Sequence, residues 1–129
     1  MVISQYYQLV RVFKNTWFAR YAEKEDISDD EMKEAVNQLE AGQAVANLGG
    51  DVYKIRVARS GKGKSGGYRV IVLFKRKERA FYVYGFAKSK MVNIDDKTLL
   101  AYKVLAKDFF SMTDVQLDNQ IRQGKLIEL

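Results

Sequence analysis

The sequence predicts an α+β domain in which a small antiparallel sheet of about four strands carries helices packed on one face. Two observations predict this class. Three short β-rich segments follow one another in the middle of the chain, and segments with helical periodicity and capping residues flank them on both sides. The length of 129 residues and the hydrophobic fraction of 47% indicate a single domain, residues 1–129.

The N-terminal third is expected to form one strand and two helices. Alternating residues predict a strand over Gln8–Lys14, and a short helix follows over Thr16–Lys24. Ser28 and Glu31 have the spacing of a capping box, in which each side chain bonds the backbone N–H of the other residue. They open a helix over Asp29–Ala41, and the glycines that follow predict a turn into the sheet.

Three strands joined by short connections are predicted in the middle of the chain. They cover Asp51–Ala58, Tyr68–Lys75 and Ala80–Lys88 and form an antiparallel meander. The segment Arg59–Gly67 between the first two is a loop rich in glycine and lysine. The second strand is apolar on both of its faces, which is typical of a strand in the centre of a sheet.

The last part of the chain, from about residue 95 to 129, is predicted to be a helical extension. Its first helix covers Asp96–Phe110 and is capped by Asn93 or Asp95. A second capping box begins at Thr113 and opens a last helix that ends at Gly124. The apolar tail after this glycine forms one more strand or packs on the helix.

The composition excludes several kinds of chemistry. The chain has no cysteine and no histidine, and therefore no disulfide, no thiolate and no imidazole for metal binding or proton transfer. We expect no metal and no other cofactor, so that any catalysis must use Lys, Arg, Tyr, Asp or Glu. The sequence contains neither a membrane-spanning apolar run nor a signal-peptide pattern, which predicts a cytoplasmic protein with no membrane partner.

Positive charge is concentrated in the middle of the chain. The segment Val52–Lys90 contains twelve lysines and arginines and a single acid, which is a net charge of +11, whereas the remaining chain carries −5. Such a segment indicates a nucleic-acid partner, with a merely solvated basic surface as the alternative.

Three of these cations are expected on one face of the sheet. Lys54 and Arg56 are two residues apart on a strand, so both side chains point to the same side, and Arg69 lies on the antiparallel neighbour. Clustered cations without acids favour a phosphate-rich ligand. The even positions of the last strand would align further side chains, whose aromatic members either stack on unpaired bases or belong to the core. These positions are Tyr82, Tyr84, Phe86 and Lys88.

The glycine–lysine loop has two interpretations. The run Gly61-Lys62-Gly63-Lys64-Ser65 resembles the end of a phosphate-binding loop of nucleotide-hydrolysing proteins. That motif leads into a helix and needs an upstream glycine, whereas here a strand follows and Arg59 takes the place of the glycine. We therefore interpret the loop as a basic clasp on an RNA backbone. Its contacts would be Arg59, Lys62 and Lys64, with Lys90 after the last strand.

In this region the sequence resembles the RelE/ParE superfamily of type II toxins. The resemblance rests on the segments Asp51–Val57, Gly67-Tyr68-Arg69 and Ala87-Lys88-Ser89-Lys90. The glycine–lysine loop and Gly85-Phe86-Ala87-Lys88 are similar to the HigB-type branch. The resemblance covers roughly Gly50–Ile94 and implies a RelE-like, microbial RNase-type fold.

The resemblance also implies a function, a toxin that cleaves mRNA on the ribosome without a metal and so inhibits translation. In this reaction the 2′-hydroxyl attacks the adjacent phosphate and leaves a 2′,3′-cyclic phosphate. The implied partner is an antitoxin, expected to be a helix-turn-helix repressor of the HigA kind. Two alternatives stay open: a ParE-like toxin that inhibits gyrase without cleaving RNA, and a plain RNA- or ribosome-binding module.

The family's functional residues can be matched by position. Lys54 and Arg56 match the two basic strand residues that activate or stabilise the reacting groups. Arg69 matches the arginine at the scissile phosphate, and Lys88 matches the basic end of the last strand. The compact archetype has a tyrosine after this strand, where the chain instead reads Met91-Val92-Asn93-Ile94. Tyr84 is therefore the candidate for a catalytic phenol.

Overall fold

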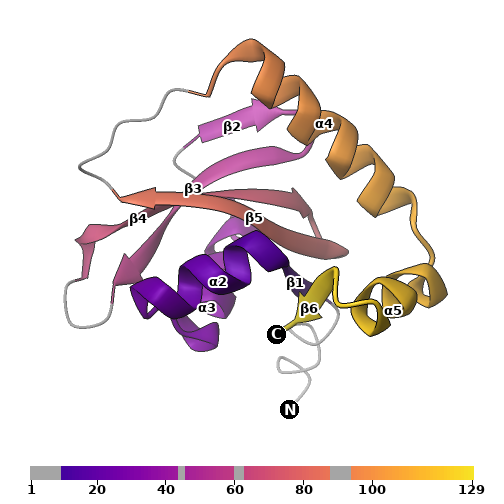
Figure 1. The fold of residues 1–129 in the computed structure, drawn as a ribbon. Coiled ribbons are helices and arrows are strands. Elements are labelled where there is room, and N and C mark those ends of the chain that lie inside the picture. The colour runs from indigo at the N-terminus through magenta and orange to yellow at the C-terminus, as the bar shows by residue number, and fades with distance from the viewer. Residues whose placement is uncertain (1–9, 44–45, 60–62, 88–93) are drawn as a thin grey trace.

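A computed structural model of the chain describes residues 10–43, 46–59, 63–87 and 94–129. In these residues, helices pack against a six-stranded sheet with the order β2-β3-β4-β5-β1-β6 (Figure 1). The strands are β1 (Arg11–Asn15), β2 (Ala46–Gly49), β3 (Val52–Arg59), β4 (Gly63–Lys75), β5 (Arg79–Ala87) and β6 (Leu126–Glu128). The helices are α2 (Thr16–Glu25), α3 (Asp29–Glu40), α4 (Asp96–Ser111) and α5 (Asp114–Arg122).

The α+β class is confirmed, but the sheet is larger than expected and mixed. The predicted meander is present as β3, β4 and β5, each antiparallel to the next. β1 is parallel to β5, and the short strands β2 and β6 pair antiparallel with β3 and β1 at the two edges. The sheet thus has six strands rather than about four. β4 also begins at Gly63, so part of the predicted loop belongs to a strand.

Helices cover both faces of the sheet, where the sequence predicted one. Figure 1 shows α4 on one side of the sheet and α2 and α3 on the other. The cause lies in β4, because Val70 and Val72 belong to one buried cluster, whereas Ile71 and Leu73 belong to another. A strand that is apolar on both faces needs a cover on both.

The helices begin where the sequence predicted, because their caps are local. The two capping boxes are present: Ser28 accepts from the backbone N–H of Glu31, and Thr113 accepts from that of Gln116. α4 is capped by Asp95, whose carboxylate accepts from the backbone N–H of Thr98 at 2.7 Å. Of the two caps considered for this helix, Asn93 lies outside the described residues.

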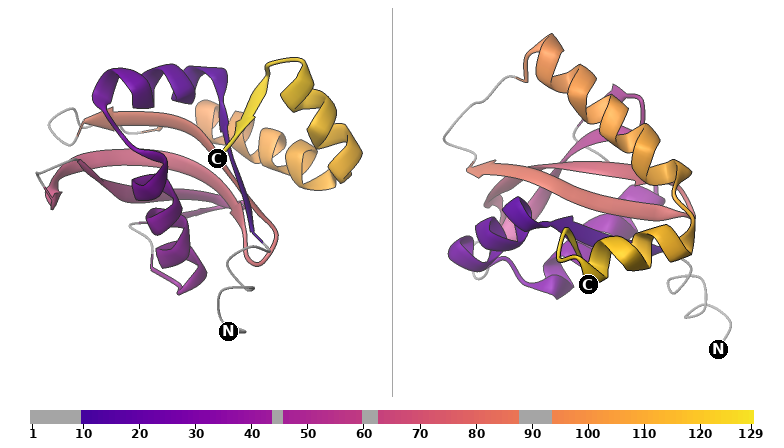
Figure 2. Two further views of the ribbon diagram at one scale, coloured as in Figure 1. Left: turned by 90° about the horizontal axis from the view of Figure 1, so that it is seen from below. Right: turned by 45° about the vertical axis from the view of Figure 1, so that its right-hand side comes forward.

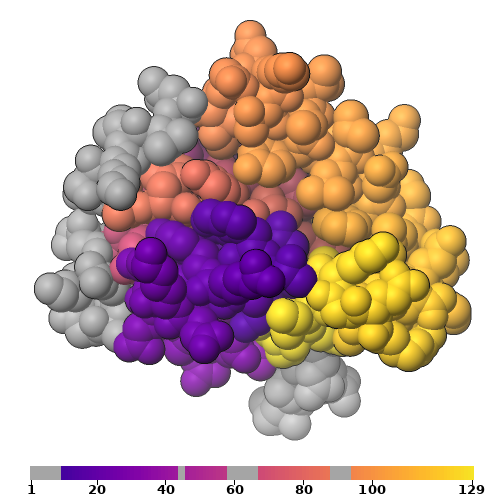
Figure 3. Space-filling model, in the orientation of Figure 1, coloured from indigo at the N-terminus to yellow at the C-terminus, as the bar shows by residue number. Residues whose placement is uncertain are grey.

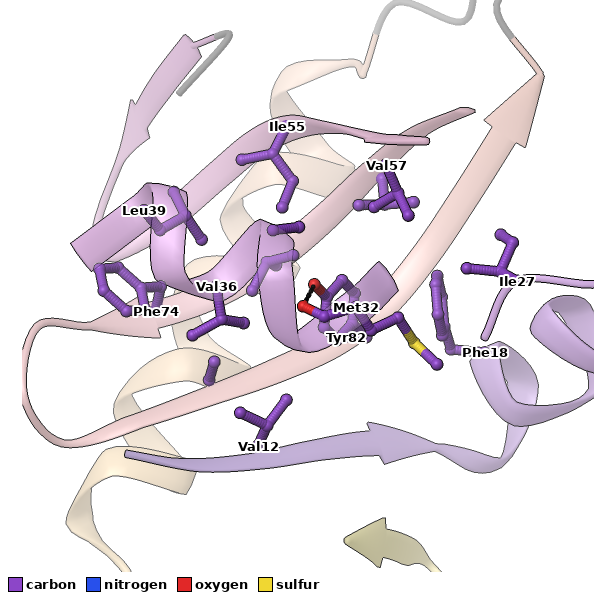
Figure 4. Close-up of a cluster of buried hydrophobic side chains, with 14 of the residues drawn as sticks. Val12, Phe18, Ile27, Met32, Val36, Leu39, Ile55, Val57, Phe74 and Tyr82 are labelled. Atoms are coloured by element: carbon purple, nitrogen blue, oxygen red, sulfur yellow. Dashed lines mark hydrogen bonds between the residues drawn. The ribbon is translucent and has the colours of Figure 1, made fainter. Parts of the chain in front are cut away.

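The first core lies between the sheet and helices α2 and α3. Met32, Val36 and Leu39 of α3 point toward the sheet, where they contact strand residues such as Ile55 (Figure 4). At the centre of this core, the hydroxyl of Tyr82 donates to the backbone carbonyl of Met32 at 2.6 Å. α3 is therefore held to β5 by a buried hydrogen bond as well as by apolar contact.

The second core lies under α4 and α5. Phe81 is fully buried there and stacks on Phe13 and Phe109, with ring centroids 4.9 and 4.6 Å away. The end of the chain returns to this side, so that β6 lies beside β1 in both views of Figure 2. Arg11 reinforces this closure through ion pairs with three carboxylates, those of Asp114, Asp118 and Glu128. Within the described residues, no helix is long and apolar enough to cross a bilayer.

Candidate nucleic-acid interface

Two arginines face each other on adjacent strands. Arg56 of β3 and Arg69 of β4 are direct partners in the antiparallel ladder, and Phe86 of β5 is the partner of Arg69 on its other side. The three residues thus form a row across the sheet, on the face that α4 partly covers. Like charges directly opposite each other destabilise a sheet, which makes this pairing costly in the free protein.

The pKa of Arg69 and its hydrogen bonding reflect the same unfavourable pairing. Burial, and then the charge of Arg56, lower the pKa of the Arg69 guanidinium below its ordinary value. Its Nη1 atom is buried and has no hydrogen-bond partner in the part of the chain that the structure describes. A guanidinium with an unused donor beside a second cation is suited to bind a phosphate with two parallel hydrogen bonds.

Lys54 and Tyr84 belong to the neighbouring row. Ile71 is the ladder partner of both, so Lys54 and Tyr84 lie on either side of it on the same face. Lys54, Tyr84 and Arg69 are partly buried and Arg56 is exposed. The structure therefore brings together the four predicted residues Lys54, Arg56, Arg69 and Tyr84, with Phe86 at the edge of the group. We call these five residues the cationic patch.

Tyr82 does not belong to this patch, and its prediction as an RNA contact was wrong. The ladder between β4 and β5 shifts by one residue, with Val72 opposite Tyr82 but Ile71 opposite Tyr84. Such a bulge interrupts the simple alternation of side chains. Tyr82 therefore points into the first core, where it is fully buried, while Tyr84 stays partly exposed on the face of the patch. Phe86 lies on the same face but is buried, so its predicted stacking on an RNA base is not available in this structure.

The buried phenol of Tyr82 predicts a pH dependence of stability. Burial raises the pKa of Tyr82 above its ordinary value, so the folded protein holds the phenolic proton more tightly than the unfolded chain does. This contribution is complete below about pH 10 and is lost as the pH rises further. Tyr82→Phe should cost about 1 kcal/mol at pH 7 because the bond to Met32 is lost.

Urea unfolding between pH 7 and 11 checks this expectation. Above pH 10 the free energy of unfolding should fall more steeply for the wild type than for Tyr82→Phe, so the difference between the two proteins shrinks. Parallel curves for both proteins would contradict the assigned role of Tyr82.

The aromatic residues next to the patch include two that sequence reasoning missed. Trp17 of α2 stacks on Tyr84 with ring centroids 4.6 Å apart, and it also stacks on Tyr21 at 5.1 Å. From the other side, Tyr102 of α4 is close enough to Tyr84 for the two phenols to interact electrostatically. Figure 3 shows β5 at the surface between the indigo of α2 and the orange of α4. No periodicity links these segments, so only the fold reveals their contact.

Gly85 explains how α2 comes so close to β5. A Cβ atom at this position would lie 2.6 Å from a ring carbon of Tyr21 and 3.3 Å from one of Phe18. A side chain here would push α2 away from the sheet. The glycine between Tyr84 and Phe86 therefore allows the helix that carries Trp17 to pack against the edge of the patch.

The remaining predicted contacts are described in part or not at all. Arg59 ends β3 and Lys64 lies near the start of β4, so their backbones flank the connection between these strands. Lys62, Lys88 and Lys90 lie outside the described residues. Among the described residues, no group of three acids is placed to hold a metal ion together.

A second group of lysines lies at the other end of β3. Lys75, Lys103 and Lys107 line an open pocket of about 300 Å³ beside the turn at Gly50 and Asp51. Lys103 and Lys107 are one helical turn apart on α4, a segment for which the sequence predicted a helix but no binding residues. Positive charge on this side of the molecule therefore extends beyond the cationic patch.

Comparison with known protein families identifies one match that covers nearly the whole chain. The family model described as "RelE toxin of RelE / RelB toxin-antitoxin system" matches residues 10–129. The match includes the cationic patch and the C-terminal segment with α4, α5 and β6.

Proposed function

The chain belongs to the RelE toxin family, and from this premise we propose that it is an endoribonuclease that cleaves mRNA on the ribosome and thereby inhibits translation. The toxin role in a toxin–antitoxin system follows from the family. The proposal adds that the chain cleaves mRNA, that it does so without a metal and on the ribosome, and that it belongs to the HigB-type branch.

The opposed pair Arg56 and Arg69 is the observation that carries the proposal. Two cations held face to face, one with a buried donor that has no partner among the described residues, are stabilised when an anion lies between them. The pentacoordinate phosphorane formed during RNA cleavage carries more negative charge than the starting phosphodiester. The same pair therefore stabilises the transition state more than the ground state, which is the condition for catalysis.

The proposed reaction needs no oxidant, metal or water. The 2′-oxygen forms a bond to the adjacent phosphorus while its proton passes to a base, and the bond from phosphorus to the 5′-oxygen breaks. The leaving oxygen takes up a proton, so the products are a 2′,3′-cyclic phosphate and a 5′-hydroxyl. Only two proton transfers and charge stabilisation are required, and Lys, Arg and Tyr supply both.

Lys54 and Tyr84 are the described candidates for the proton transfers. They lie on either side of Ile71, on the face of the arginine pair. Lys54 is the candidate base because it is a partly buried amine in the row next to the arginine pair. The phenol of Tyr84 is the candidate acid, and Lys88, beyond the described residues, would add a cation at the end of β5.

The proposed partner that silences the toxin is an antitoxin of the HigA kind, with a helix-turn-helix domain. The support is the HigB-like glycine–lysine loop in the sequence together with the RelE family match. A surface of this partner that is complementary in charge and covers the cationic patch would exclude RNA from it.

Mapping of mRNA 5′ ends in a purified bacterial translation system tests the proposal. The wild type should cut mRNA only when ribosomes are present. Treatment of the purified protein with EDTA, before it is added to the ribosomes, should not reduce the activity. Lys54→Ala should slow cleavage by about 100-fold or more, the range expected for loss of a proton-transfer group. Lys33→Ala, on the exposed side of α3, is the matched control and should cut like the wild type.

Two other outcomes would overturn the proposal in different directions. Intact mRNA at high protein concentration, together with inhibition of gyrase, would favour a ParE-like activity. Intact mRNA with binding to ribosomes or RNA would favour a plain binding module.

A further inference from the structure

We infer that Trp17 forms, together with Tyr84, a subsite that binds an unpaired nucleobase of the RNA at the rim of the cationic patch. This inference rests on the proposed function and adds a recognition element to it. Trp17 is the single tryptophan of the chain and was not among the predicted site residues.

The exposure of Trp17 is the first argument. The residue keeps 43% of its accessible surface although its ring lies beside two other rings. An exposed aromatic ring that borders a cationic site offers a stacking surface to an unpaired base.

The position of Trp17 is the second argument. Its ring stacks on Tyr84, the ring of Tyr84 lies 6.3 Å from that of Phe86, and Phe86 is the ladder partner of Arg69. Two ring contacts thus link the indole to Phe86, which is the residue opposite Arg69 in the ladder. Single-stranded nucleic acid requires this combination, a cation for the backbone and an aromatic surface for the adjacent base.

The fold holds the indole in place before RNA binds. Asn15 caps α2 and accepts from the backbone N–H of Phe18, while its own amide donates to the carbonyl of Val83 in β5. The first turn of the helix is therefore attached to the strand immediately before Tyr84. A ring that is already fixed loses little conformational entropy on binding, which favours a base-binding role.

The test measures whether Trp17 senses a base rather than the backbone. A short single-stranded RNA with 2′-O-methyl groups cannot be cleaved by the proposed reaction. A series of such RNAs, each with one abasic position, is titrated into the full-length wild type and into Trp17→Phe and Trp17→Leu. At one position, removal of the base should weaken wild-type binding by about 5- to 100-fold, the range for one base–aromatic stack.

The two variants separate a ring contact from simple packing. Trp17→Phe keeps a ring and should retain most of the discrimination, whereas Trp17→Leu keeps an apolar side chain and should bind the intact and the abasic RNA equally. Val115→Ala, an exposed apolar position on α5, should behave like the wild type. The tryptophan fluorescence of the wild type, which comes from Trp17 alone, should change with the intact RNA and much less with the abasic one.

Unchanged discrimination in Trp17→Leu at every position, or no discrimination in the wild type, would overturn the inference. If the wild type still cleaves mRNA in that case, the proposed function stands without the subsite. If discrimination depends on Trp17 but no cleavage occurs, the subsite stands and the proposed activity fails. Loss of antitoxin binding alone in Trp17→Leu would identify the indole as a protein contact instead.

Discussion

Arg69→Met is expected to abolish mRNA cleavage and, at the same time, to stabilise the folded protein. Removal of one preorganised donor from a charge-stabilising site costs about 100- to 1,000-fold in rate, and Arg69 is the partly buried member of the arginine pair. Methionine replaces the stem of the side chain but removes its charge. The experiment combines 5′-end mapping in a translation system with urea unfolding of the purified variant.

The gain in stability follows from the same contacts. In the free protein the guanidinium of Arg69 has a buried donor without a described partner and faces Arg56 across the ladder. Relief of both costs should raise the free energy of unfolding by about 1 kcal/mol. This opposition of activity and stability is expected at a site that binds an anion.

Two further variants make the result specific to Arg69. Arg76→Met removes the same charge from the exposed connection between β4 and β5 and should change neither cleavage nor stability appreciably. Arg69→Lys keeps the charge but not the planar fork, and should cut more slowly than the wild type. Full cleavage by Arg69→Met would contradict the role of the arginine pair, and a clear loss of stability would show that Arg69 supports the fold.

Phe81→Ala is expected to have the largest effect on stability. Phe81 is fully buried and contacts three rings, those of Phe13 in β1 and of Phe109 and Phe110 in α4. Truncation of such a residue costs about 3–5 kcal/mol through lost contact and an unfilled cavity. This loss is a large fraction of the total stability of a domain of this size.

Urea unfolding followed by circular dichroism measures this cost. Phe81→Leu keeps most of the volume and should cost roughly 1–1.5 kcal/mol, whereas Leu100→Ala on the exposed face of α4 should stay within about 0.5 kcal/mol of the wild type. If Phe81→Ala cost no more than Phe81→Leu, the packing of α4 against β5 and β1 would not be the main support of the second core.

Elements with local signals could be predicted from the sequence. The capping boxes at Ser28 and Thr113 begin α3 and α5 as expected, because the bonds they make span three residues of the chain. The meander of β3, β4 and β5 was also predictable, since consecutive strands with short connections pair with one another. Within it, the strand period of two was sufficient to bring Lys54 and Arg56 to one face.

Elements that depend on distant contacts could not be predicted in this way. For the apolar tail the sequence left a strand and packing on the last helix open, and the strand β6 forms because it pairs with β1, more than a hundred residues earlier in the chain. The sequence of β4 indicated that it was apolar on both faces. That helices cover both faces of the sheet, however, followed only from the packing of α4. Short strands carry too little pattern to specify a partner, and tertiary contact determines their pairing.

The sequence alone determined the family resemblance, the meander, the capped helices and the placement of Lys54, Arg56 and Arg69 as one group of cations. The tertiary structure alone decided which aromatic residues join them. The bulge at Val83 lies between Tyr82 and Tyr84 and leaves their side chains on opposite faces, with Tyr82 in the first core, and the approach of α2 at Gly85 brings Trp17 onto Tyr84. The physical reason is that the direction of a side chain past a bulge, and its contacts across elements, depend on packing rather than on the order of residues.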